Sequence, residues 1–235
     1  MTATTLTGWQ ATTALARLSL RRVLRGKALW FAIAIGLFPC LLAIAWRANS
    51  LAGVEAWDRV TVTFALVMAI VAPILVASSL SDEIDDRTAA YLWSRAVPRW
   101  TVVSGKLLGL APVVAGSLVL GLLACWLILG GPTVVSGAEF ARALVGFDAG
   151  AIGCSAVSAL IATLAPRFAV PIAVAWLLLL DATVGALDVG LHAITVSFGT
   201  KAIARGDDGL VGPLSLVIIT VLALGIACYR VDKIE

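Results

Sequence analysis

Residues 107–129 have the sequence LLGLAPVVAGSLVLGLLACWLIL, in which no side chain carries a charge. A helix needs about 20 apolar residues to cross the hydrocarbon core of a bilayer. A helix also satisfies its own backbone hydrogen bonds in lipid, whereas a barrel would need short alternating strands. This continuous run therefore predicts a transmembrane helix.

Five further runs approach the same length, and the composition of the whole chain agrees with them. Of the 235 residues, 61% are hydrophobic and 13% are charged, whereas soluble domains carry about 25% charged residues. We therefore predict an all-α integral membrane protein, with one transmembrane domain over residues 1–235. Its six predicted spans are 28–46, 60–79, 107–129, 143–164, 168–187 and 214–228.

The leader before the first span places apolar residues at near-helical spacing between arginines, over residues 8–25. This pattern is typical of an amphipathic helix in the plane of the lipid headgroups. A simple basic topogenic signal is the alternative. A cleaved secretion signal is disfavoured, because the polar leader is long and five more spans follow the first.

The lysines and arginines are distributed unevenly between the two sides of the predicted spans. Six spans place both termini on one side, which then holds twelve of the seventeen cations. The positive-inside rule puts the richer side in the cytosol. We therefore expect a multi-pass protein of the inner (cytoplasmic) membrane with both termini cytosolic. Trp46 and Trp57 are expected as anchors at the outer interface.

The residues that commonly bind metals or phosphate are sparse in this sequence. The four cysteines lie singly inside apolar runs, and the one histidine is His192. Small buried hydrophobic side chains are the favoured interpretation of such cysteines, and no metal site is expected. There is no G-x-x-x-x-G-K-[ST] phosphate-binding loop. We expect a chain that is not an enzyme, with no catalytic residue and no cofactor of its own.

The longest predicted cytosolic connection, residues 80–106, concentrates charge in an otherwise apolar chain. Its acidic part follows the second span directly, and Thr88 can cap a short helix after it. An apolar Tyr-Leu-Trp run in that helix, ringed by charge, favours a protein groove over water. A solvated loop without a partner is the alternative. Pro98 suits the first turn of the next helix.

The segment SDEIDDRTAAYLWSRAVPRWTVVSGKLLG, residues 81–109, resembles the signature region of ABC-2 type permeases. These are the membrane subunits of ATP-binding-cassette exporters. The similar elements are an acidic cluster, then R-T-x-x-Y-L, then a basic-aromatic turn and G-K-x-x-G at the third span. The resemblance implies a coupling helix over about 88–96 that sits in a groove of the ATPase. The residues implied in coupling are Asp82, Glu83, Asp85, Asp86, Arg87, Thr88, Tyr91, Leu92, Trp93 and Arg95.

The same resemblance implies the partners and the activity. Two permeases, this chain with a second copy or with a homologous permease, would pair above two separate ABC ATPase subunits. ATP and magnesium would be bound by those ATPase subunits. The chain would form the substrate path and couple ATP hydrolysis to export. Membrane lipid is a further expected partner, and nucleic acid is not. The alternatives are a secondary carrier or channel, or an ABC membrane subunit that does mechanical or assembly work without moving a solute.

Two acids fall inside predicted spans, Asp148 in the fourth and Asp181 in the fifth. A carboxylate at the bilayer centre costs roughly 2.5–3.5 kcal/mol on insertion scales, so it normally faces protein or water. Both are candidates for the substrate path or for carrying a proton. A position at a helix end or an interhelical hydrogen bond is the alternative for each. The apolar segment 188–213 predicts short helices at the outer surface.

Overall fold

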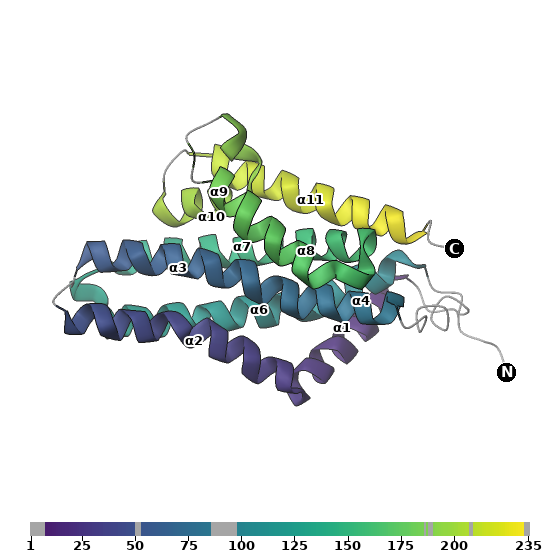
Figure 1. The fold of residues 1–235 in the computed structure, drawn as a ribbon, viewed down its shortest axis with the longest axis horizontal. Helices are drawn as coiled ribbons and strands as arrows, with labels where there is room; N and C mark the ends of the chain where they lie inside the picture. Colours follow the sequence, from purple (N-terminus) through teal and green to yellow (C-terminus); the bar gives the residue numbers. More distant parts are fainter. Residues whose placement is uncertain are drawn as a thin grey trace.

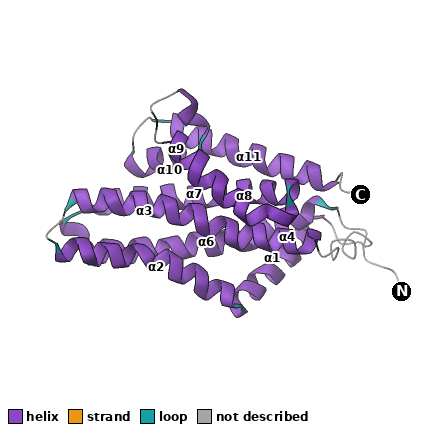
Figure 2. Ribbon diagram, viewed as in Figure 1, coloured by secondary structure: helices purple, strands orange, loops and turns teal. Residues whose placement is uncertain are grey.

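The computed structural model describes residues 8–49, 53–85, 98–185, 187, 190–206 and 209–232. Within these ranges the chain is helical and contains no strand (Figure 2). Six helical stretches are long and apolar enough to cross a membrane, which confirms the six-span all-α class. They are Lys27–Ala48, Val54–Ser81, Trp100–Leu129, Gly137–Leu164, Pro166–Val184 and Val211–Val231.

The first three spans follow an N-terminal helix. The elements are α1 (Gly8–Arg25), α2 (Lys27–Ala48), α3 (Val54–Ala72), the π-helical η1 (Pro73–Ala77), α4 (Ser78–Asp85) and α6 (Trp100–Leu129). The elements of the second half are η2 (Gly131–Thr133), α7 (Gly137–Leu164), η3 (Pro166–Phe168), α8 (Ala169–Ala175), η4 (Trp176–Asp181), α9 (Ala182–Val184), η5 (Gly190–Ile194), α10 (Val196–Arg205) and α11 (Val211–Asp232).

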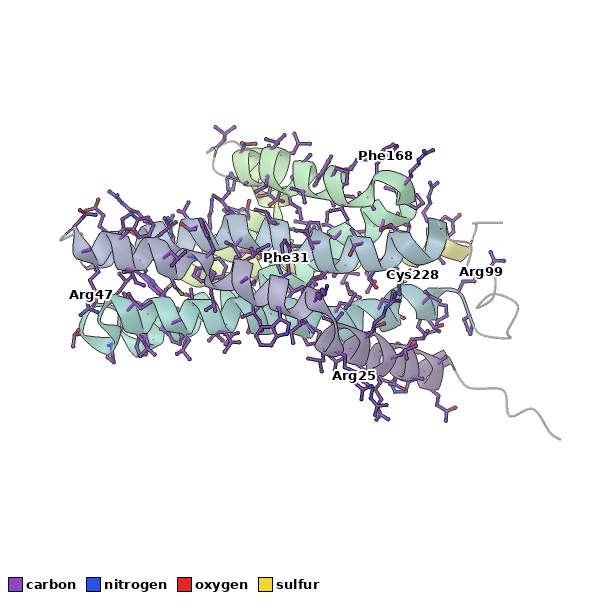
Figure 3. All side chains as sticks on the ribbon, turned by 60° about the horizontal axis from the view of Figure 1, so that its bottom comes forward. Arg25, Phe31, Arg47, Arg99, Phe168 and Cys228 are labelled. Atoms are coloured by element: carbon purple, nitrogen blue, oxygen red, sulfur yellow. The ribbon has the colours of Figure 1, made fainter. Side chains whose placement is uncertain are left out.

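The two longest helices, α6 and α7, organise the bundle. Helices α1 and α2 pack mainly on α6, while α10 and α11 pack on α7. The N- and C-termini lie at the same end of the bundle, and α10 lies at the opposite end (Figure 1). The side chain of Arg47 marks that opposite end, and Arg99 lies toward the end of the termini (Figure 3).

Helix α1 approaches α6 at two glycines that are four residues apart. A Cβ atom added to Gly105 would lie 2.8 Å from the Leu15 Cβ, and one added to Gly109 would lie 2.5 Å from the Ala16 carbonyl oxygen. Small residues at this spacing let two helices pack with their backbones in contact. The G-K-x-x-G element therefore provides the docking surface for α1.

Two of the spans contain π-helical segments. Pro73 begins η1, and η4 follows Pro171 in the next turn of the fifth span. A proline inside a helix lacks one hydrogen-bond donor and clashes with the preceding turn, and a π-helical segment absorbs such a disturbance. The second span thus continues without a break from α3 into α4.

The expectation that Trp57 anchors the chain at the lipid interface is wrong. Its side chain is 7% exposed and packs against Phe140, with 6.3 Å between the ring centroids. The loop between the first two spans is short, so the first turn of α3 already lies against α7. Trp57 is therefore part of the protein core.

Candidate functional site

The loop that resembles the ABC-2 signature is described only at its two flanks. Asp82, Glu83 and Asp85 belong to the last turns of α4 by their backbone. Their side chains lie outside the described part of the structure. The remaining candidates lie outside the described residues altogether: Asp86, Arg87, Thr88, Tyr91, Leu92, Trp93 and Arg95. The coupling helix stays a prediction.

The flanks of this loop are held together by a buried lysine. Lys106, in the second turn of α6, is 2% exposed. Its ammonium group donates a hydrogen bond to the carbonyl oxygen of Ser79 in α4. A buried ammonium group is stable only when it is hydrogen bonded or paired. Lys106 therefore fixes the end of the second span against the beginning of the third.

The first turn of α6 is closed by local hydrogen bonds. The backbone N–H of Thr101 donates to the Pro98 carbonyl oxygen at 3.0 Å, and the Thr101 hydroxyl donates to the same oxygen at 2.6 Å. Pro98 precedes the helix, which begins at Trp100. Local hydrogen bonds thus fix the start of α6.

Asp181 ends the π-helical part of the fifth span and caps α10. Its carboxylate accepts from the backbone N–H of Val196 at 2.7 Å and of Ser197 at 2.9 Å. The Ser197 hydroxyl donates to the Asp181 carbonyl oxygen at 2.7 Å. A carboxylate at a helix N-terminus satisfies unpaired N–H groups and interacts favourably with the helix dipole. Asp181 therefore joins the fifth span to α10.

An apolar cavity of about 480 Å³ lies beside Asp181. It is bounded by α7, by the fifth span and by α11, and Asp181 is the one charged side chain among its lining residues. The lining includes Leu160, Trp176, Val196 and Ile219. Pockets that bind small ligands in proteins measure about 300–1,000 Å³, so this cavity is large enough for a small apolar ligand.

Asp148 lies in α7 and makes different contacts from Asp181. Its side chain is half-buried, and within the described residues its Oδ1 atom has no hydrogen-bond partner. The lining of the cavity beside Asp181 does not include Asp148. The roles predicted for the two acids on the substrate path stay predictions.

Two of the cysteines lie together, although the sequence separates them widely. The Sγ atoms of Cys125 in α6 and Cys40 in α2 are 3.4 Å apart. The Cys40 thiol also donates to the Gly121 carbonyl oxygen at 3.6 Å. Both are free, buried thiols. Their contact belongs to the packing of α2 on α6.

Comparison with protein families identifies the family of this chain. The chain matches the family described as ABC-2 family transporter protein over residues 21–180. The chain is an ABC-2 family transporter protein. The match extends from residue 21 in α1 through the first four spans and into the fifth, and it includes the loop between α4 and α6. Comparison with curated proteins gives no match to this permease.

Membership of this family confirms the resemblance carried by residues 81–109. The protein is a permease of an ABC transporter and a multi-pass membrane protein. Lys106 is the residue of the site that sequence reasoning missed. The sequence shows Lys106 as part of G-K-x-x-G and as one cation among many, whereas the structure shows that its charge is buried and hydrogen bonded to the preceding span.

Proposed function

We propose that this permease exports a substrate with energy from ATP hydrolysed by a separate ABC ATPase subunit. The observation that carries the proposal is the buried Lys106, which joins α4 to α6 at the base of the loop. A force applied to residues 86–97 would act on the second and third spans together. A flexible loop between unconnected spans would dissipate such a force.

The proposed assembly contains two permeases and two ATPase subunits. ATP and magnesium bind to the ATPase subunits, and the loop over residues 80–106 sits on them in the cytosol. This orientation is supported by the distribution of cations, since twelve of the seventeen fall on the side of both termini. It is also supported by the position of the two termini and of the flanks of the loop at one end of the bundle (Figure 1). The membrane is then the inner, cytoplasmic membrane.

The proposed mechanism is a shift between two conformations of the bundle. ATP binding changes the distance between the ATPase subunits, and the loop has different affinity for the two states. A partner can shift such an equilibrium only by its differential affinity for the two conformations. The cavity beside Asp181 is our candidate for the part of the path that meets an apolar substrate.

The experiment is purification of the tagged permease from its native membrane, followed by mass spectrometric identification of bound proteins. We expect an ABC ATPase subunit to copurify with the natural chain. The loop variants Arg87→Glu and Tyr91→Ala should each reduce its recovery at least about tenfold, as expected when an interface loses about 1.4 kcal/mol or more.

The control for this experiment is Arg59→Gln, which removes a charge from the opposite end of the bundle. Arg59 is exposed and pairs with Glu55 at 2.7 Å. Its variant should retain the ATPase subunit. Purification of a permease without any ATPase subunit, together with uptake or efflux driven by an ion gradient alone, would favour a secondary carrier instead.

A further inference from the structure

A second cavity, of about 310 Å³, lies at the end of the bundle opposite the termini. It is formed by the first turns of α3, the beginning of α7 and the helix α10. None of its lining residues belongs to the cavity beside Asp181 or to the flanks of the 80–106 loop. The function proposed above therefore leaves it unassigned.

Three cations line this cavity: Arg142 from α7, with Lys201 and Arg205 from α10. Lys201 and Arg205 are four residues apart, so they lie on the same face of α10. Burial and the nearby charge of Arg205 lower the pKa of Lys201, and the Asp181 carboxylate acts in the opposite direction. The cavity thus holds like charges close together in a partly desolvated place.

No described carboxylate forms an ion pair with any of these three cations. Within the described ranges the one ion pair joins Arg59 to Glu55. Glu139 also lines the cavity, but its Oε2 atom accepts from the Ser136 N–H and hydroxyl, both at 3.0 Å, in the capping box of α7. Asp58 also lines the cavity and is exposed to solvent. An anion inside the cavity would relieve the repulsion between Lys201 and Arg205.

The guanidinium group of Arg142 is placed by the end of α10. Gly206 ends this helix with φ +75°, and its N–H donates to the Ala202 carbonyl oxygen at 2.9 Å. A Cβ atom at Gly206 would lie 2.5 Å from Arg142 Nη1. The missing side chain therefore makes room for the guanidinium, and the negative end of the helix dipole favours a cation there.

The lining of this cavity also has an apolar wall, which includes Trp57, Val62 and Phe147. A hydrated inorganic anion gains nothing from such a wall, whereas an acyl chain buries apolar surface against it. We propose that this cavity binds an anionic lipid. Its phosphate group contacts Arg142, Lys201 and Arg205, and the first part of its chain lies along α3.

The test is native mass spectrometry of the purified full-length permease in detergent, titrated with phosphatidylglycerol or phosphatidylcholine. The natural chain should bind phosphatidylglycerol with higher affinity. Lys201→Gln and Arg142→Gln should each weaken that binding about tenfold, because each removes one charge-assisted contact to phosphate. Lys201→Arg keeps the positive charge and should bind phosphatidylglycerol as the natural chain does. Equal binding of the two lipids, or unchanged binding by both glutamine variants, would overturn the proposal.

Two controls separate this site from general attraction to charge and from a site for a free anion. Arg59→Gln removes a cation from the same end of the bundle outside the lining and should leave lipid binding unchanged. Inorganic phosphate should compete only weakly, and binding of phosphate without binding of the lipid would overturn the lipid assignment. Arg205 is exposed, so Arg205→Gln provides the same test if a variant at a more buried position does not fold.

Discussion

Replacement of Lys106 by methionine is expected to lower the permease-dependent ATPase rate of the reconstituted complex about tenfold. The ammonium group is buried and donates to the Ser79 carbonyl oxygen, so the variant frees the end of α4 from the beginning of α6. A hydrogen bond to a charged group contributes about 1.5–3 kcal/mol, and about 1.4 kcal/mol corresponds to a tenfold change in an equilibrium. The rate is measured in proteoliposomes with the isolated ATPase subunit as reference.

The matched control is Lys27→Met. Lys27 is also a lysine near the start of a transmembrane helix, but its side chain is exposed. Methionine has a length similar to that of lysine, so both variants should insert and purify as the natural chain does. Normal rates in Lys106→Met, or an equal loss in Lys27→Met, would show that the link between α4 and α6 does not transmit the force.

Asp181→Asn is expected to destabilise the permease by about 1–3 kcal/mol, because a buried N–H group would lose its acceptor. The carboxylate accepts from two backbone N–H groups, of Val196 and Ser197. Asparagine offers one oxygen, and its NH₂ group would face the other N–H. For a chain of this size the midpoint of thermal unfolding falls roughly 2–4 °C for each kcal/mol. Hydrogen exchange at the amides of residues 196 and 197 should also become faster.

Asp148→Asn is the control for this variant. It removes the same charge from a membrane span, but in the described residues its Oδ1 atom accepts no hydrogen bond. Its free energy of unfolding should change less than that of Asp181→Asn, because no hydrogen bond to the Oδ1 atom is lost. If Asp181→Asn changed transport and left both the midpoint and the exchange rates unaltered, Asp181 would act on the substrate path and not as the cap of α10.

The six membrane-spanning helices could be predicted from the sequence because the bilayer imposes a minimum length on apolar runs. The helices extend beyond those runs. The run at 143–164 belongs to a helix that begins at Gly137, where Ser136 and Glu139 form a capping box. The run at 214–228 belongs to a helix over Val211–Asp232. Apolar composition identifies the part of a helix that lies in hydrocarbon, while capping residues determine where the helix begins.

The contacts of the site depend on residues that are distant in the sequence, and periodicity does not predict them. Asp181 caps a helix that begins fifteen residues later. Lys106 bonds to a carbonyl oxygen twenty-seven residues earlier. Local patterns show that both side chains are unusual in a membrane protein, since charge in an apolar span is costly. They do not show which backbone group compensates each charge.

The most direct test of the central claim is site-specific crosslinking from the loop to the ATPase subunit. A photoreactive residue replaces Tyr91 in one sample and Arg59 in another, and both are irradiated in native membranes with and without ATP. We predict that position 91 captures an ABC ATPase subunit, with a yield that changes with ATP, and that position 59 captures none. Capture of the ATPase from position 59, or no capture from position 91 in a complex that contains the ATPase, would contradict the claim that the loop over residues 80–106 contacts the ATPase subunit.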